Sequence, residues 1–261
     1  MDLGLNGKRA LVLGSSQGIG AEIARVLARE GCDVYVGARR LDHIQSLADE
    51  LSEEFNVDAK AYPIDLSDGI SVEKLCEMIT HEWKIDILLN NAGGPPPSPS
   101  TGVPDEIWES SLQSLLMSTI RLSEAAVKGM RERGWGRILT VASSGVIQPI
   151  PNLAVSNTVR SAVVGFTKTL SNEVAKDGIT VNMVLPGRID TERLASIHEA
   201  SANKQGMTYE EFRDNSRSSI PARRFGTAKE FAEVAVFLMS VCASYITGSV
   251  IRVDGGVIQS V

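Results

Sequence analysis

Short runs of apolar residues alternate along the chain with longer segments in which apolar residues recur at helical spacing. The short runs predict strands over residues 9–13, 33–38, 58–63, 85–90, 137–142, 180–185 and 249–253. The helical spacing predicts helices over residues 18–30, 43–55, 70–83, 104–133, 153–176 and 229–241.

Strands that alternate with helices are typical of βαβ units, whose strands pair in parallel. Because such crossovers are right-handed, few topologies are compatible with this order. We therefore expect an α/β fold: a Rossmann-type, doubly wound parallel sheet of seven strands with helices on both faces. The length of 261 residues suits a single domain over residues 1–261.

Two segments interrupt this alternation. Residues 93–104 hold five prolines and no apolar period, which predicts a stiff extended loop at the carboxyl end of the fourth strand. Residues 190–225 are polar, could form two short helices and show no strand pattern. Because so long a connection inside a domain is usually a functional lid or a disordered segment, we interpret residues 190–225 as a lid segment.

Composition narrows the classes of partner. The formal net charge is −6, which opposes binding to nucleic acid or to an anionic membrane surface, since both need a basic face. No apolar run approaches the ~18 residues of a membrane span, and no leader peptide precedes the first strand. The three cysteines show no CxxC spacing and suit a reducing compartment, so we expect a cytoplasmic protein.

The turn after the first predicted strand is rich in glycine and reads Gly14-Ser-Ser-Gln-Gly18-Ile-Gly20. Gly14 allows a positive φ, Gly18 lets the backbone approach a pyrophosphate, and Gly20 permits close packing of helix on strand. The amino terminus of the next helix then faces the phosphates with unpaired N–H groups. An ordinary tight βα turn is the alternative interpretation of this pattern alone.

Further motifs follow in order along the chain: Asp65-Leu66, Asn91-Ala92-Gly93, Pro186-Gly187 with Ile189 and Thr191, and Val253-Asp-Gly-Gly256. With the GxxxGxG spacing, the chain resembles the short-chain dehydrogenase/reductase family over nearly its whole length. By overall resemblance it looks like the 3-oxoacyl-carrier-protein reductases of that family. The resemblance implies that a nicotinamide cofactor contacts Gly14, Ser16, Gln17, Gly18, Ile19, Gly20, Asp65, Leu66, Asn91, Ala92, Gly93, Pro186, Gly187, Ile189 and Thr191.

The end of the second strand bears on which cofactor is bound. NAD-binding chains place a carboxylate there, which accepts from the ribose hydroxyls and would repel a 2′-phosphate. This chain has Ala38 at that position, followed by Arg39 and Arg40. Because arginine grips phosphate well, we expect NADP(H) to be preferred, with NAD(H) as the alternative. A solvated basic pair at a strand end is the other interpretation.

The catalytic positions implied by the resemblance are unusual. The family's serine aligns with Ser143, but its tyrosine and lysine positions hold Ser156 and Arg160, and its upstream asparagine position holds Leu115. A serine hydroxyl is a much weaker acid than a phenol, and a guanidinium does not release its proton in proteins. Arg160 can still donate to the ribose hydroxyls of the cofactor. We therefore expect weak or non-standard activity, with Ser143, Ser156 and Arg160 as the candidate catalytic residues.

The sequence does not identify the proton donor, which could be water, Ser156 or a residue of the lid segment. Tyr209 is the candidate tyrosine in that segment. His198 is interpreted as a solvated histidine. Arg188 is either a ligand for an anionic substrate group or a surface arginine. The alternative function is a non-catalytic dinucleotide-binding sensor or partner subunit.

The remaining expectations concern partners. The substrate is expected to be a small molecule with a carbonyl or alcohol group, whose identity and reaction direction the sequence leaves open. By resemblance we expect a homotetramer, formed through residues 104–133, residues 153–176 and the carboxyl-terminal strand.

Overall fold

In the computed structural model, which describes residues 1–260, the main sheet contains the strands β1 (Arg9–Leu13), β2 (Asp33–Ala38), β3 (Ala59–Pro63), β4 (Ile87–Asn90), β5 (Gly136–Val141), β6 (Ile179–Pro186) and β9 (Val250–Val253). They pair in parallel in the order β3-β2-β1-β4-β5-β6-β9. The predicted doubly wound sheet of seven parallel strands is confirmed. The central strands β1, β5 and β6 are almost entirely buried and most of their residues are apolar, as a sheet covered on both faces requires.

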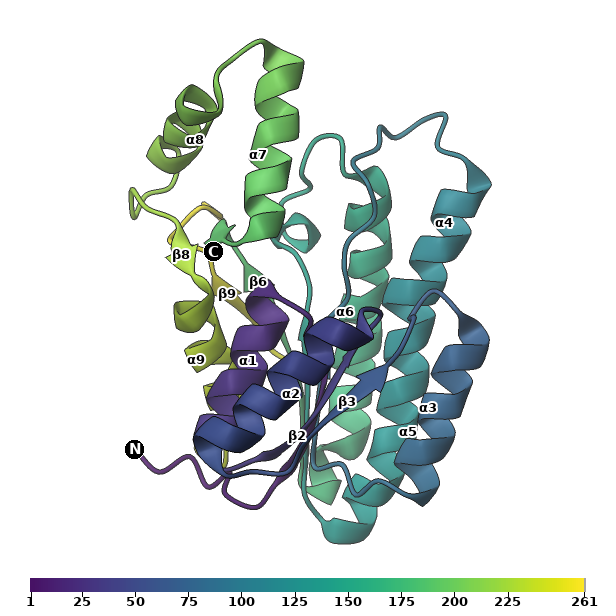
Figure 1. Cartoon of the computed structure of the whole chain (residues 1–261). Coiled ribbons are helices and arrows are strands. Elements are labelled where there is room, and N and C mark those ends of the chain that lie inside the picture. Colours follow the sequence, from purple (N-terminus) through teal and green to yellow (C-terminus); the bar gives the residue numbers. More distant parts are fainter. Residues whose placement is uncertain (261) are drawn as a thin grey trace.

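The long helices are α1 (Gly18–Arg29), α2 (Leu41–Phe55), α3 (Gly69–His81), α4 (Asp105–Ser111), α5 (Ser118–Arg133), α6 (Ala154–Val174), α7 (Glu192–Gln205), α8 (Tyr209–Ser218) and α9 (Ala228–Leu238). One face of the sheet is covered by α1, α2 and α9, and the other by α3, α5 and α6 (Figure 1). No helix within residues 1–260 is both long enough and apolar enough to cross a bilayer.

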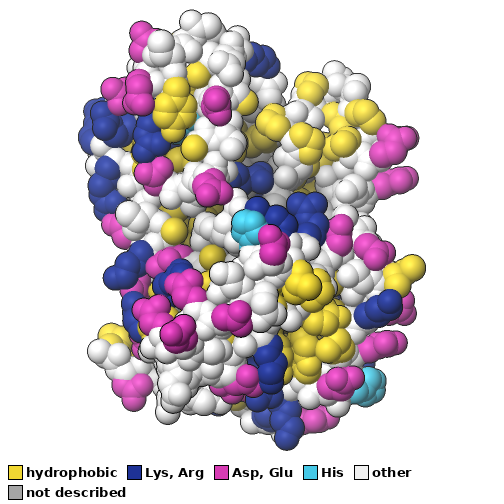
Figure 2. Space-filling view, viewed as in Figure 1, with side chains coloured by type: hydrophobic (Ala, Val, Ile, Leu, Met, Phe, Trp, Pro, Cys, Tyr) yellow, Lys and Arg dark blue, Asp and Glu magenta, His cyan; other side chains and the backbone are white. Residues whose placement is uncertain are grey.

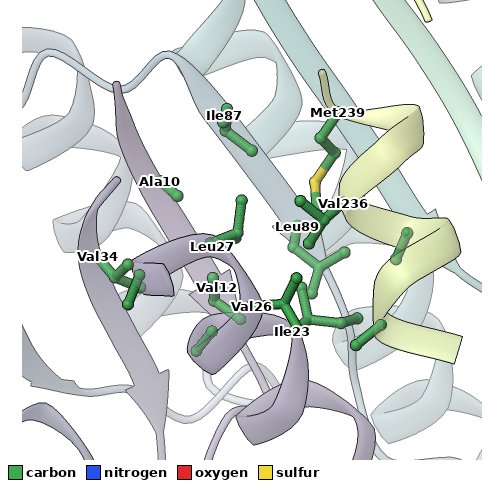
Figure 3. Packing of buried hydrophobic residues seen from close by; sticks show 14 of the residues in the cluster. Ala10, Val12, Ile23, Val26, Leu27, Val34, Ile87, Leu89, Val236 and Met239 are labelled. Carbon is green, nitrogen blue, oxygen red and sulfur yellow. The ribbon is translucent and has the colours of Figure 1, made fainter. Parts of the chain in front are cut away.

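The core on the α1 and α9 side shows why the sequence adopts this order. Ile23 and Leu27 of α1 project from the apolar face of that helix onto Val12 of β1 and Leu89 of β4 (Figure 3). All four side chains are completely or almost completely buried. Burial of a side chain of this size contributes about 1.5–3 kcal/mol each, so this contact fixes α1 against the centre of the sheet.

The chain runs outward in opposite directions from the middle of the sheet. From β1 it proceeds to β2 and β3, whereas β4, β5, β6 and β9 extend the sheet on the other side. Open α/β sheets bind ligands at the carboxyl ends of the strands where this reversal occurs. The crevice between the ends of β1 and β4 is therefore the expected place for a site.

The predicted single helix over residues 104–133 is interrupted. A π-helical stretch, η1 (Leu112–Met117), separates α4 from α5. Hydroxyl side chains flank it: Ser111 Oγ donates to the Ile107 carbonyl at 2.6 Å, and Ser118 Oγ donates to the Ser114 carbonyl at 2.6 Å. Such bonds compete with the regular helical hydrogen bonds, which explains why an uninterrupted apolar period does not give an uninterrupted helix.

The lid segment contains the two predicted helices, α7 and α8, and its base differs from the prediction. Two-residue strands β7 (Ile189–Asp190) and β8 (Gly226–Thr227) pair in parallel where the segment leaves and rejoins the domain. Within residues 190–225 only Asp190 lies in a strand, so the prediction that the segment lacks a strand is wrong at its first residue alone. A two-residue strand has no periodicity that a sequence pattern could reveal.

Candidate cofactor and active site

The glycine turn between β1 and α1 has the tight geometry that its sequence predicts. Gly14 adopts φ +62°, and a Cβ on Gly20 would lie 2.2 Å from the Gly14 carbonyl oxygen. Asn91, which follows β4, donates from Nδ2 to that same carbonyl at 3.2 Å. The turn and the end of β4 are therefore bound to each other, and a side chain at Gly20 would push them apart.

The first turn of α1 is open to a ligand. Gln17 is the N-cap residue and makes no side-chain capping bond. A Cβ on Gly18 would meet only Thr191, whose Cγ2 would lie 3.5 Å away. The segment after β6 thus reaches back to the glycine turn and brings Thr191 to the amino terminus of α1.

The segment after β6 is held in place because its backbone packs closely against the backbone of Val253 and Asp254. Gly187 donates its N–H to the Val253 carbonyl at 2.9 Å, and a Cβ on Gly187 would lie 2.5 Å from the Cα of Asp254. Pro186 ends β6 and Ile189 begins β7. The sequence motif around Pro186-Gly187 is thereby placed across the crevice from the glycine turn.

A basic pair lies beside the glycine turn. The Arg40 guanidinium donates to Ser16 Oγ at 3.4 Å and to Gln17 Oε1. Burial of Asp65 acts to raise its pKa, but hydrogen bonds from Ser67 and the charge of Arg39 outweigh this effect and lower it. Figure 2 shows Lys and Arg side chains gathered near the middle of this face, above α2. Positive charge is thus concentrated where β2 and β3 end.

Ser143 follows β5 and lies beside the start of α6. Its Oγ accepts from the Gly145 N–H at 3.1 Å, which makes it the N-cap of a short 3₁₀ helix. A Cβ on Gly145 would lie 3.3 Å from Ser143 Oγ and 2.3 Å from Asn157 Oδ1. The absence of a side chain at Gly145 therefore allows the Ser143 loop to pack against the first turn of α6.

Ser156 and Arg160 are one turn apart on α6 and face inward, with exposed fractions of 8% and 9%. The Arg160 guanidinium donates to the Val141 carbonyl at 3.1 Å and to the Ala92 carbonyl at 3.2 Å. It links the carboxyl ends of β4 and β5. Burial, and secondarily the charge of Arg193, lowers the pKa of Arg160 to about 10.

A small cavity of about 10 Å3 brings several predicted residues together. Leu66, Asn91, Ala92 and Arg160 all line it, and so does Leu115. Leu115 is buried against Val155 and Val159 of α6 in a small apolar cluster. Where the family resemblance implies a polar asparagine, the fold therefore places hydrocarbon.

Two residues near the site were missed by the sequence patterns. Asn90 lines the same cavity, and its Oδ1 has no hydrogen-bond partner within residues 1–260. Arg193, in the first turn of α7, donates to the Gly94 carbonyl at 3.4 Å across the mouth of the crevice. The sequence signal for Arg193 is only its charge two residues after Thr191, which is too common a feature to be informative.

The lid segment corrects two interpretations. His198 is 3% exposed rather than solvated, and its Nε2 lies 3.1 Å from Ser216 Oγ. Arg188 donates from Nη1 to the Ser216 carbonyl and to Ser219 Oγ, so it braces α8 against the base of the lid segment. Tyr209 begins α8, and its hydroxyl accepts from Arg213 at 3.0 Å. The partners of these residues lie within the lid segment or at its base.

Comparison with known proteins agrees with the geometry. The family model described as Enoyl-(Acyl carrier protein) reductase matches residues 14–258. The chain is 34% identical to the 3-oxoacyl-[acyl-carrier-protein] reductase FabG of Escherichia coli over 257 residues, which is 97% of this chain and 98% of that protein.

Solved structures of related proteins have the same fold as this chain. L-sorbose reductase from Gluconobacter frateurii, complexed with NADPH and L-sorbose, superimposes with a TM-score of 0.94 at 33% identity, covering 100% of both chains. YwfH, an NADPH-dependent reductase involved in bacilysin biosynthesis, gives a TM-score of 0.93 at 29% identity, covering 98% of this chain and 100% of that one. The chain belongs to the short-chain dehydrogenase/reductase family, whose members are NAD(P)-dependent oxidoreductases acting on carbonyl and alcohol substrates.

Proposed function

We propose that this protein is a cytoplasmic, NADP(H)-dependent member of the family that interconverts a carbonyl and an alcohol on a small molecule, with an atypical proton-transfer site. The observation that carries the proposal is convergence at one edge of the sheet. The glycine turn, the Arg40–Ser16 contact and the buried Arg160 all lie at the carboxyl ends of the strands. The three cysteines form no disulfide within residues 1–260, which agrees with a reducing compartment.

The residues of the crevice suit NADP(H). The uncapped amino terminus of α1 offers N–H groups and the positive end of its dipole to a pyrophosphate. Arg40 and Ser16 would hold the 2′-phosphate, because guanidinium and hydroxyl groups both donate to phosphate oxygens. Structural relatives contain NADPH or NADP, which supports this choice. When bound, the cofactor supplies or accepts the hydride.

Ser143, Ser156 and Arg160 would handle the oxygen of the substrate. The Ser143 hydroxyl would hydrogen-bond the carbonyl oxygen and polarise it. Ser156 stands at the position of the family's tyrosine, yet its hydroxyl is a weak acid at the end of a short side chain. Loss of a well-matched general acid generally lowers the rate by about 100- to 10,000-fold, so turnover should be slow unless water or a lid residue donates.

Arg160 would keep the role of the family's lysine in holding the cofactor, but not its role in proton transfer. Its Nη1 and Nη2 each donate one hydrogen bond to a backbone carbonyl. The remaining N–H groups of the guanidinium are left for the nicotinamide ribose hydroxyls. It would also place positive charge beside the proton-transfer site. It cannot itself donate the proton, since guanidinium remains protonated at neutral pH.

The lid segment and the quaternary structure complete the proposal. Arg193 already bridges from α7 to Gly94, so closure of residues 190–225 over the crevice would enclose the substrate and exclude water. Assembly as a homotetramer would use α5, α6 and the edge strand β9. In support, α6 carries exposed small residues at helical spacing, Ser161, Gly165 and Thr169, which would allow close approach of another helix.

An absorbance assay of NADPH oxidation with a panel of ketones, 3-oxoacyl thioesters and ketoses tests the proposal. We expect slow turnover with at least one class of substrate, abolished by Ser143→Ala. No turnover with any substrate, at protein concentrations that bind NADPH stoichiometrically, would contradict an enzymatic role.

A non-catalytic dinucleotide-binding sensor or partner subunit is the second candidate. The apolar cluster around Leu115 favours it, because it removes a polar route for protons next to α6. The discriminating result is NADPH binding without turnover, combined with an NADPH-dependent change in the protection of the lid segment from hydrogen exchange.

A further inference from the structure

A second pocket lies at the opposite edge of the sheet, at the amino-terminal ends of β5 and β6. It has a volume of about 280 Å3, and its walls include Trp135, Arg137, Ile179, Thr180 and Val241. At about 3.3 Å per residue, the length of β5 separates it from the cofactor crevice by roughly 20 Å. It is therefore distinct from the site described above.

Arg137 brings to this pocket a charge that no carboxylate within residues 1–260 neutralises. The residue is 3% exposed, and its guanidinium donates to three backbone carbonyls, those of Ser240, Gly136 and Gly178, from Nε and Nη1. Burial lowers the pKa of Arg137 to about 10, and no acidic side chain acts against this shift. Buried charges are normally paired, so an anion beside Arg137 would relieve an unfavourable state.

One nitrogen of this guanidinium is available to a ligand. Nη2 makes no hydrogen bond within residues 1–260, and it is not among the polar atoms that are sealed from solvent. Arg137 is one of the residues that line the pocket, and we infer that Nη2 faces it. A single free nitrogen can bind one oxygen of an anion, but it cannot form the bidentate contact that uses two guanidinium nitrogens.

Thr180 supplies a second, independent observation. It is the direct partner of Arg137 across the parallel β5–β6 pair, so the two side chains project from the same face of the sheet. Its exposed fraction is 5%, and its Oγ1 is enclosed without a hydrogen-bond partner within residues 1–260. An enclosed hydroxyl without a partner is costly, and a ligand oxygen next to Arg137 would satisfy it once a small shift of the pocket wall exposes it.

Ser244 and Thr247 also line the pocket, and the remaining wall is hydrocarbon and glycine with two cations beside its tryptophan. The Trp135 ring faces two cations, Arg137 Cζ at 4.4 Å and Lys8 Nζ at 4.3 Å from its centroid. Ile179 and Val241 add hydrocarbon to the walls. The pocket thus combines one anion-binding corner with an apolar surface.

We propose that this pocket binds a small organic carboxylate. One carboxylate oxygen accepts from Arg137 Nη2 and the hydroxyl of Thr180, and the short apolar part of the ligand packs against Trp135 and Val241. The site acts independently of the cofactor crevice at the other edge of the sheet.

Fluorine NMR of the 5-fluorotryptophan-labelled full chain tests this, because the chain has only three tryptophans and Trp135→Phe identifies the resonance of interest. The probes are butyrate, its neutral isostere butyramide, and inorganic phosphate, all at constant ionic strength. We expect butyrate to shift the Trp135 resonance saturably, and butyramide and phosphate to leave it in place. An unmoved resonance with butyrate, or an equal shift with butyramide or phosphate, overturns the proposal.

The Thr180→Val variant tests the role of this hydroxyl in binding butyrate without disturbing the fold. It removes a hydroxyl that has no partner in the free protein, so the variant should fold as the native chain does. We expect its affinity for butyrate to fall about 10-fold or more, the loss typical of one hydrogen bond to a charged group. Thr101→Val, the same change at an exposed position of the loop over residues 93–104, should leave the affinity unchanged. Equal affinities in the two variants would place butyrate elsewhere and overturn the proposal.

Discussion

At the scale of single residues, Arg160 is the side chain whose environment says most about the site. It is buried, has no ion pair with any of the described residues 1–260, and is held by the carbonyls of Val141 and Ala92 at the ends of two adjacent strands. Such a guanidinium is fixed in place and stays charged. We therefore propose that Arg160 provides positioning and charge but not the proton.

Restoring the family's residue types at Ser156 and Arg160 should restore proton transfer. We predict that Ser156→Tyr combined with Arg160→Lys raises kcat/KM for carbonyl reduction by about 100-fold or more, because a phenol next to an ammonium is a competent general acid. The measurement is steady-state NADPH oxidation with the best substrate of the panel.

The matched control is Ser156→Phe with Arg160→Lys, which supplies the ring without the hydroxyl. It should show no gain. If both double variants behaved alike, Ser156 would not occupy the position of the proton donor.

The residue scale also shows which roles a sequence can predict. Gly14 and Gly20 were predictable because their function depends on near neighbours and on backbone conformation. The roles of His198 and Arg188 were not, because their partner Ser216 is 18 residues away from one and 28 from the other. Polarity alone assigned His198 to solvent, and tertiary packing placed it in the interior.

At the scale of elements, the β1–α1 turn depends on the absence of a side chain. We predict that Gly20→Ala destabilises the protein by about 1–3 kcal/mol and weakens NADPH binding, because the added Cβ would lie 2.2 Å from the Gly14 carbonyl oxygen. Urea unfolding and a fluorescence titration with NADPH measure the two effects.

Gly69→Ala, at the first position of α3, is the control. The nearest atom to its new Cβ would be 3.7 Å away, so stability should stay within ~0.5 kcal/mol of the native chain. Native-like stability of Gly20→Ala would contradict the close packing of the turn.

The lid segment should respond to pH through His198. Burial, followed by the charges of Arg188 and Arg213, lowers the pKa of His198, whereas Asp190 acts to raise it. The neutral imidazole is therefore preferred when α7 and α8 are packed. The stability that this contributes is complete above the ordinary pKa of 6.5 and is lost as the pH falls below it.

We accordingly predict faster hydrogen exchange in residues 192–218 at pH of about 5.5 than at about 7.5, after correction for intrinsic rates. His198→Gln should remove this difference, and His43→Gln, at an exposed position of α2, should retain it. A pH response that persists in His198→Gln would assign the effect to another group.

Elements differed in how well the sequence predicted them. The central strands were predictable because most of their residues are apolar and polar segments bound them. The π-helical stretch η1 was not, because the Ser111 and Ser118 hydroxyls that flank it leave the apolar period unchanged. The strands β7 and β8 consist of two residues each and depend on contact between distant segments.

At the scale of the whole molecule, the proposed homotetramer depends on the outer face of α6. We predict that the native chain sediments at four times its mass of 28.0 kDa and that Gly165→Arg dissociates it. A Cβ on Gly165 meets no atom within 4 Å in the protomer, so the arginine is tolerated there and excluded only by a neighbouring subunit.

Ala200→Arg, on the exposed face of α7, adds the same side chain away from the proposed interface and should leave the assembly intact. Analytical ultracentrifugation distinguishes these outcomes. A monomeric native chain, or an intact tetramer of Gly165→Arg, would contradict the proposed interface.

We propose that one edge of the sheet forms a working NADP(H) site although the proton-transfer position beside it is altered. Calorimetric titration of the native chain and of Arg40→Ala with NADPH and NADH tests it most directly. We predict tighter binding of NADPH than of NADH by the native chain, and loss of about 10- to 100-fold in NADPH affinity, with little change for NADH, in Arg40→Ala. Absence of binding to either nucleotide, or tighter binding of NADH by the native chain, would contradict the claim.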